Sequence, residues 1–414
     1  MEGIVRQKKL FFTIICLSAV LSFFPLSHAY AAGFFSGYAG VKTDLGFSGS
    51  DNSFDPQLLL QSFFAGQFNL TSDVIARIEF SLSTDDLIEN SVFKKTPAEF
   101  QIDEVSLMYR KQFPGFSNYL SCFMGTYEPI GSDIFLRRQF GIQPISSKIT
   151  ESWLGLSGSV LYPLFGIGLA DVVHFTSQPV AAGVYSYVNH ENSDYYVFNT
   201  DLRFACVYPY LYLDVAGGIG APLKNDYNGD EVIVLIDTLY AHGGLNLLVG
   251  NNYTPVSLFL QAGVYDIPLK RGGTGLSIDP DKVYLLLEPR FQMPSLQLRF
   301  TLFSLPPGTV ENLLFIHDTL GFNMLAYTDS LYAGNGAFSF GINTTFSFSD
   351  ANYEMFFNPL NFTLSTLNVS LSPYTSMQLF SGEIHIMAQM SLTDIVRASY
   401  ASAFRLNVGY RTQL

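Results

Sequence analysis

Apolar and polar residues alternate along most of this chain with a period of two. From residue 35 onward the odd positions carry Phe35, Val41 and Leu45, while Lys42 and Asp44 lie between them. The same pattern returns over residues 74–83, 296–302 and 404–414. Successive side chains of a β-strand point to opposite faces, so this period predicts strands with one apolar and one polar face. After residue 30 no uninterrupted apolar stretch reaches the ~18 residues that a membrane-spanning helix requires.

The composition has too few charged residues for the surface of a water-soluble domain. Of the 414 residues, 48% are hydrophobic and only 14% are charged, whereas soluble domains carry about 25% charged residues. The net charge of −13 has the wrong sign for binding a nucleic-acid backbone. The 38 Phe and 24 Tyr residues exclude a disordered chain, because such chains have few aromatic residues.

The N-terminal segment has the order of a secretory signal peptide. Arg6, Lys8 and Lys9 precede an apolar run over residues 10–26, and Ala29 and Ala31 form a small-residue ending that suits signal peptidase. We therefore expect a cleaved signal peptide at residues 1–31 and a single domain at residues 32–414. An uncleaved membrane anchor is the alternative.

The connections between the expected strands alternate between short and long. Short links such as 71–73 and 163–164 separate longer ones such as 84–99, 128–150 and 176–193. This segregation predicts an all-β transmembrane antiparallel up-and-down β-barrel, with short periplasmic turns and long extracellular loops. Closure is required because an open sheet edge in hydrocarbon leaves a row of unpaired backbone groups. We expect about 18 strands, with a range of 14 to 18, at residues 34–47, 57–70, 74–83, 100–110, 118–127, 151–162, 165–175, 194–206, 210–220, 237–249, 256–266, 283–291, 296–304, 319–328, 337–348, 361–371, 377–390 and 402–414.

The last eight residues, Asn407 to Leu414, resemble the C-terminal β-signal of bacterial outer-membrane proteins. Asn407, Gly409 and Leu414 match that signal, whereas Thr412 stands where an aromatic residue is usual. With the signal peptide and the loop pattern, the mature chain resembles an outer-membrane porin over its whole length. The resemblance implies export through the general secretory route, periplasmic chaperones, the barrel-assembly machinery, a lipid surround in the bacterial outer membrane and small solutes as partners. It leaves homotrimeric assembly open.

In porins the loop after the fifth strand folds into the lumen and narrows it. The corresponding segment here is 128–150, although the family's Pro-Glu-Phe-Gly-Gly motif is absent. An ordinary outer loop is the alternative. The resemblance implies a constriction carrying Glu128, Asp133, Arg137, Arg138 and Lys148.

The polar faces of the strands carry charges of both signs in nearly equal number. Such residues need water inside the barrel, because a charged side chain at the lipid midplane costs roughly 2–4 kcal/mol. We therefore expect an aqueous channel rather than a packed core. Mutual pairing, for example of Arg77 with Glu79, is the structural alternative. The expected lumen wall consists of Lys42, Asp44, Arg77, Glu79, Glu104, Arg110, Asp201, Arg203, Asp214, Glu288, Arg290, Arg299, Arg405 and Arg411.

Catalytic and metal-binding patterns find little support. The acidic loop 226–231 has Glu231 where a calcium-binding EF-hand needs glycine. His242 and Asn246 share a strand face, but no serine is fixed beside them. We expect no enzymatic activity, no cofactor and no metal. Pro289 predicts a bulge or a strand end. Cys122 and Cys206 are either free thiols or one disulfide.

We therefore expect a passive diffusion channel for small hydrophilic solutes. The first alternative is a barrel similar to fatty-acid transporters, which carry hydrophobic ligands. Those transporters have an N-terminal hatch before the first strand, whereas here a strand begins within about four residues of Ala31. A surface adhesin or structural barrel is the other alternative, with loops such as 176–193 binding host or phage proteins.

Overall fold

The computed structural model of the chain describes residues 34–48, 55–88, 97–150, 165–190, 196–225, 232–234, 238–270, 278–310, 313, 316–328, 331–333, 336–349, 351–357, 366–379 and 381–414. The expected signal peptide and the acidic loop 226–231 lie outside these residues.

The described residues form β-strands with a few short helices. The strands are β1 (Phe34–Ser48), β2 (Asp55–Asn69), β3 (Val74–Thr84), β4 (Ala98–Phe113), β5 (Phe116–Thr126), β6 (Phe165–Phe175), β7 (Val180–Asn189), β8 (Tyr196–Tyr208), β9 (Leu211–Asn225), β10 (Val232–Val234), β11 (Thr238–Val249), β12 (Val256–Lys270), β13 (Val283–Gln292), β14 (Gln297–Ser304), β15 (Leu320–Tyr327), β16 (Leu331–Ala333), β17 (Gly336–Phe348), β18 (Leu367–Leu379), β19 (Gly382–Ser391) and β20 (Phe404–Gln413). The helices are α2 (Ile134–Phe140), α3 (Pro307–Val310), α4 (Leu392–Val396), η1 (Pro280–Lys282) and η2 (Tyr353–Phe357).

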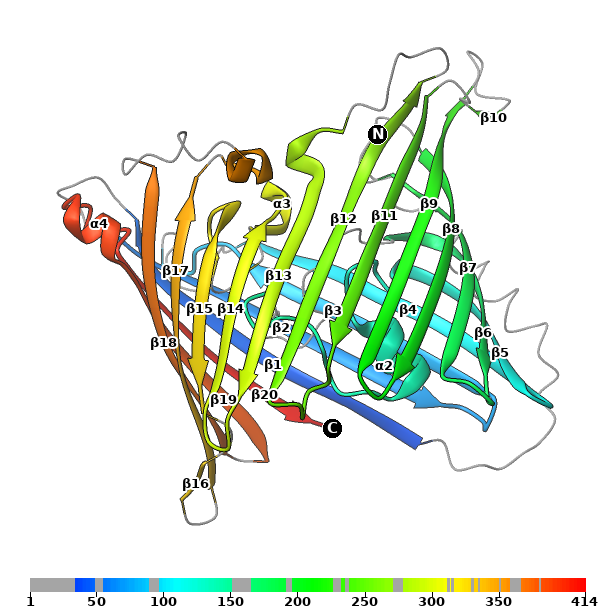
Figure 1. Cartoon of the computed structure of the whole chain (residues 1–414), viewed down its shortest axis with the longest axis horizontal. Helices are drawn as coiled ribbons and strands as arrows, with labels where there is room; N and C mark the ends of the chain where they lie inside the picture. The colour runs from blue at the N-terminus through cyan, green and yellow to red at the C-terminus, as the bar shows by residue number, and fades with distance from the viewer. Residues whose placement is uncertain are drawn as a thin grey trace.

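These strands close into one antiparallel barrel (Figure 1). Each strand pairs with its neighbour along the chain, and β20 closes the ring on β1 through pairs from Tyr38↔Gln413 to Leu45↔Leu406. The short β10 pairs with β9 beyond the end of β11, and β16 pairs with β17 beyond the end of β15. Strands β10 and β11 therefore occupy one position in the ring, and so do β15 and β16. The barrel has 18 strands, which confirms the predicted count and fold class.

The alternation of the sequence places apolar side chains outside and charged side chains inside. On β8, Leu202 is 64% exposed and Phe204 45%, whereas Asp201 and Arg203 between them are 1% and 3% exposed. This inside-out arrangement is that of a barrel whose outer face contacts lipid. Among the helices of the described part of the chain, none combines the length and hydropathy that crossing a membrane demands.

Short and long connections lie at opposite ends of the barrel. The short turns include 70–73, 114–115, 209–210 and 293–296, and the C-terminus lies at the same end. Helix α3 and the segment 392–403 with α4 lie at the opposite end (Figure 1).

The expected long loop over 176–193 is wrong. The chain turns at 176–179 and returns as β7, which pairs with β8 from Val180↔Cys206 to Asn189↔Val197. The inward positions of β7 include Ala181, Tyr185 and Tyr187, all at most 1% exposed. Both faces of β7 are therefore mostly apolar, and no polar alternation marks it as a strand. The expected strand at 151–162 lies outside the described residues.

Two prolines also mislead the sequence analysis. The expected turn at 372–376 lies inside β18, so the expected strands 361–371 and 377–390 are replaced by β18 and β19. Pro373 pairs with Ile342 of β17, while the ladder to β19 omits it and resumes in the same register. Pro289 of β13 likewise pairs with Leu258 while the ladder to β14 omits it. Proline lacks only its own backbone N–H, so each strand loses ladder pairing to one neighbouring strand only around the proline. Neither strand bulges or ends there.

Candidate functional site

The segment after β5 folds into the barrel and carries α2, which lies within the ring of strands (Figure 1). The helix ends at Gly141, whose φ of 65° lies in the left-handed region that glycine adopts without strain. The carboxylate of Asp133 accepts the backbone N–H groups of Ile145 at 2.8 Å and Ser146 at 3.2 Å. Asp133 therefore holds the returning chain against the start of α2.

The inserted segment gives half of the lumen a packed core. Phe135 and Leu136 of α2, with Ile145 and Ile149, are fully buried against inward residues of β5 to β14 such as Phe259. This contradicts the expectation of an aqueous lumen without a packed core. The reason is that the inserted segment supplies apolar side chains, which the inward apolar residues of the wall cover.

Wall side chains donate hydrogen bonds to the backbone carbonyls of the inserted segment. Asn246 Nδ2 donates to the carbonyl of Ser132 at 2.8 Å, and Gln261 donates to the carbonyl of Gly131. Arg203 donates to the carbonyl of Glu128. Buried carbonyls of a non-regular segment need such donors, so these wall residues replace the bonds that a strand or helix would provide.

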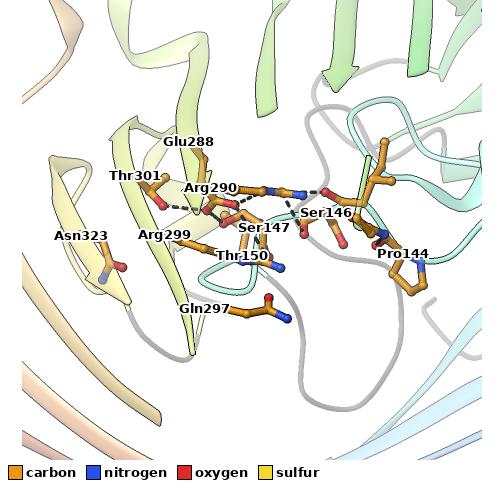
Figure 2. A network of polar contacts seen from close by, with 12 residues as sticks. Pro144, Ser146, Ser147, Thr150, Glu288, Arg290, Gln297, Arg299, Thr301 and Asn323 are labelled. Carbon is orange, nitrogen blue, oxygen red and sulfur yellow. Dashed lines mark hydrogen bonds and ion pairs between the residues drawn. The ribbon is translucent and has the colours of Figure 1, made fainter. Parts of the chain in front are cut away.

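Glu288 is the centre of a second attachment (Figure 2). Its fully buried carboxylate pairs with Arg290 at 2.7 Å and with Arg299 at 3.5 Å. The same carboxylate accepts the hydroxyl of Thr301 at 2.7 Å and that of Ser147 from the inserted segment. Arg290 also donates to the carbonyl of Ile145 at 2.7 Å, so this network holds 145–147 on β13 and β14.

Further charges of the expected lumen wall are covered by the inserted segment. Arg203 pairs with Asp214 through two bonds of 2.8 and 2.6 Å, and its guanidinium lies 4.5 Å from the ring centroid of Phe135. Asp201 accepts the Tyr187 hydroxyl at 3.0 Å and contacts His242 Nε2 at 2.8 Å. These inward charges are paired, as in the structural alternative, and Arg203 also contacts the inserted segment.

The two arginines of α2 have different surroundings. Arg138 pairs with Glu104 of β4 at 2.6 Å and with Glu128 at 3.8 Å, and its side chain is 11% exposed. Arg137 pairs with Asp133 at 3.7 Å, and its side chain is 43% exposed. Arg138 therefore fixes α2 to β4, whereas Arg137 faces open space. Lys148 lies 5.9 Å from the ring centroid of Tyr327.

A cavity of about 920 Å³ lies between α2 and the wall formed by β1 to β5 and β20. Of the expected site residues, this cavity brings together Arg77, Glu79, Arg110, Arg137, Arg138, Arg411 and Leu414. Arg77 donates from Nε to Gln67 at 3.0 Å and, within the described residues, forms no ion pair with Glu79. Arg110 donates to the carbonyl of Ser72 at 2.8 Å, and Arg411 pairs with Glu383 at 3.0 Å.

The residues that line this cavity do not include Lys42, Asp44, Arg405 and Asn407. Asp44 of β1 pairs with Arg405 of β20, and Lys42 lies opposite Gly409. Asn407 is 3% exposed. The backbone N–H of Leu414 donates to the carbonyl of Gly37 at 2.8 Å, so the expected assembly signal forms the seam where the barrel closes.

A second inserted segment, 305–319, was not expected from the sequence. Leu313 and Ile316 belong to the buried core, and His317 Nε2 lies 2.8 Å from Gln389 Oε1 of β19. Asp318 accepts the hydroxyl of Ser349 at 2.7 Å. The apolar residues Leu313 and Ile316 were the available sequence signal, because Leu and Ile are among the residue types most often buried.

Cys122 and Cys206 are free thiols. In the described residues, no group of three or more His, Cys, Asp or Glu side chains is arranged to hold a metal ion.

No protein-family model matches the chain, and no curated protein matches its sequence. Among solved structures it is similar to OmpF of Salmonella typhi in complex with daunomycin, at 10% identity over 92% of this chain and 97% of that chain, with a TM-score of 0.41. A mutant of the Rh. blastica porin is 9% identical over 92% of this chain and 100% of its own, with a TM-score of 0.38. Wzi of Escherichia coli, a carbohydrate-binding β-barrel of the outer membrane involved in group 1 capsule assembly, is 9% identical over 91% and 84%, with a TM-score of 0.47.

Proposed function

We propose that the chain is an outer-membrane porin, a water-filled channel for passive diffusion of small hydrophilic solutes. The observation that carries this proposal is the inserted α2, which narrows the lumen and leaves a cavity lined by arginines at the turn end of the barrel. Such a lining suits hydrated polar solutes and is unfavourable for the hydrophobic ligands of a fatty-acid-transporter-like barrel, because a desolvated charge is costly.

Single-channel recording tests this proposal. Full-length protein refolded in detergent and added to a planar bilayer should give discrete current steps whose size increases with KCl concentration. Heat-denatured protein is the control. Refolded, protease-resistant protein that gives no steps would contradict the channel and leave the adhesin or structural barrel as the better explanation.

We also propose that the protein reaches the bacterial outer membrane through the secretory route, with removal of residues 1–31. Periplasmic chaperones and the barrel-assembly machinery would act on it, with Asn407, Gly409 and Leu414 as the assembly signal. Mass spectrometry of protein from outer membranes should find Ala32 as the first residue, and an intact Met1 would refute the processing step. Light scattering of the detergent-solubilised protein measures whether it assembles as a homotrimer.

A further inference from the structure

The charged side chains that line the cavity beside α2 are predominantly cationic. Within the described residues they are Glu79 and five arginines, namely Arg77, Arg110, Arg137, Arg138 and Arg411. The cavity volume of about 920 Å³ exceeds that of a small organic acid several times.

The five arginines differ in how their charge is balanced. Arg137, Arg138 and Arg411 each have a carboxylate partner within 4 Å. The described partners of Arg77 and Arg110 are neutral oxygens, those of Gln67 and Ser72. The cavity therefore contains two guanidinium groups without a carboxylate partner among the described residues.

Both groups also have buried N–H donors without an acceptor. Arg77 Nη1 and Arg110 Nε are buried and have no hydrogen-bond partner in the described part of the chain. Arginine stays protonated at all physiological pH values, so these groups remain charged hydrogen-bond donors. A buried, unsatisfied charged donor is unfavourable, so turning toward an oxygen in the cavity would stabilise either guanidinium.

We propose that this cavity is a binding site for small oxyanions, whose carboxylate or phosphate group accepts hydrogen bonds from Arg77 and Arg110. The planar guanidinium presents parallel N–H donors that match the oxygens of both anion types. Glu79 lies on the same face of β3 as Arg77 and raises the energy of a ligand with a second negative group close to it. The site favours anions with one compact charged group. This inference rests on the proposed channel, since it names the solute class that dwells in it.

Isothermal titration calorimetry on folded, detergent-solubilised full-length protein tests the site without requiring conduction. The probes are inorganic phosphate and acetate, at low ionic strength so that chloride does not compete. We expect saturable binding of at least one probe, which distinguishes the two oxyanion sources. Arg77→Gln and Arg110→Gln should each weaken binding at least tenfold, and Arg77→Lys should weaken it less. Arg397→Gln, which removes an exposed arginine beside α4, is the matched control and should bind as the wild type does.

Three outcomes overturn the site: no saturable binding of either probe to the wild type, equal binding by Arg77→Gln and wild type, or an equal loss in the Arg397→Gln control. Heat-dependent gel migration checks that each variant is folded. Bilayer recording separates this inference from the channel itself. A wild type that conducts KCl but binds neither probe retains the channel and loses the site. A wild type that binds a probe through Arg77 but never conducts retains the site and loses the channel.

Discussion

Replacing Ser147 by alanine tests whether the Glu288 network holds the inserted segment in place. The substitution removes one hydrogen bond to a fully buried carboxylate and leaves Thr301, Arg290 and Arg299 on that carboxylate. A hydrogen bond to a charged group contributes about 1.5–3 kcal/mol. Since about 1.4 kcal/mol corresponds to a factor of ten, local detachment of 145–147 should become roughly 10- to 100-fold more frequent.

Hydrogen exchange followed by mass spectrometry measures this detachment. The amides of Ile145 and Ser146 donate to Asp133 at the start of α2, so they exchange when 145–147 separates from α2 as well as from the wall. When opening and closing are fast, the exchange rate follows the opening equilibrium. A peptide covering 143–150 should therefore exchange about 10- to 100-fold faster in Ser147→Ala, while peptides from β1 to β3 stay unchanged. Ser146→Ala is the control, because its hydroxyl does not contact Glu288. Equal exchange in the two variants would refute the proposed attachment.

Four other perturbations test the pore charge, the attachment of α2, the pH dependence and the closure of the barrel. Arg137→Gln should move the reversal potential in a KCl gradient toward cation selectivity, most in dilute salt where the Debye length exceeds ~10 Å; an unchanged potential would place Arg137 outside the permeation path. Arg138→Gln should instead destabilise the fold by about 3–5 kcal/mol, because it leaves Glu104 buried without its cation, and unaltered denaturant unfolding would contradict this. Burial lowers the pKa of His317, so neutral His317 stabilises its attached segment above the ordinary histidine pKa, and this stability is lost as the pH falls below it. Hydrogen exchange around His317, corrected for intrinsic rates, should therefore increase on acidification in the wild type. It should not increase in His317→Gln. Deletion from Ser402 onward should abolish membrane insertion because β1 and β19 both lose their partner β20, and a protease-resistant inserted product would count against closure.

Local patterns predicted most of the barrel because lipid and water impose opposite demands on alternate residues. Strands such as β6 and β14 were placed to within a residue or two on that basis. Strand β7 was not predicted, because Tyr185 and Tyr187 face a packed interior and the polar half of the pattern disappears. Strand β18 was not predicted across Pro373, because a strand tolerates proline when only one neighbour loses a bond.

The candidate site was predictable in membership but not in arrangement. The resemblance to porins implied Arg137 and Arg138 together, yet only the fold places Glu104 against Arg138 and leaves Arg137 open. Ser147 meets Glu288 across 141 residues of chain, and no spacing rule connects them. Their contact depends on where the inserted segment lies, which is set by packing over the whole lumen.

Because α2 fills one side of the lumen, inward residues on the two sides of the barrel are under different evolutionary constraints. Inward positions of β8 to β13, such as Phe259, are constrained like the interior of a soluble enzyme, so changes there should co-vary with changes in 127–150 among homologous chains. Inward positions of β20 and β1 to β3, such as Arg77, border the cavity and can change singly. The lining of the cavity can thus be altered on a few strands, without rebuilding the half of the barrel that carries the packed core.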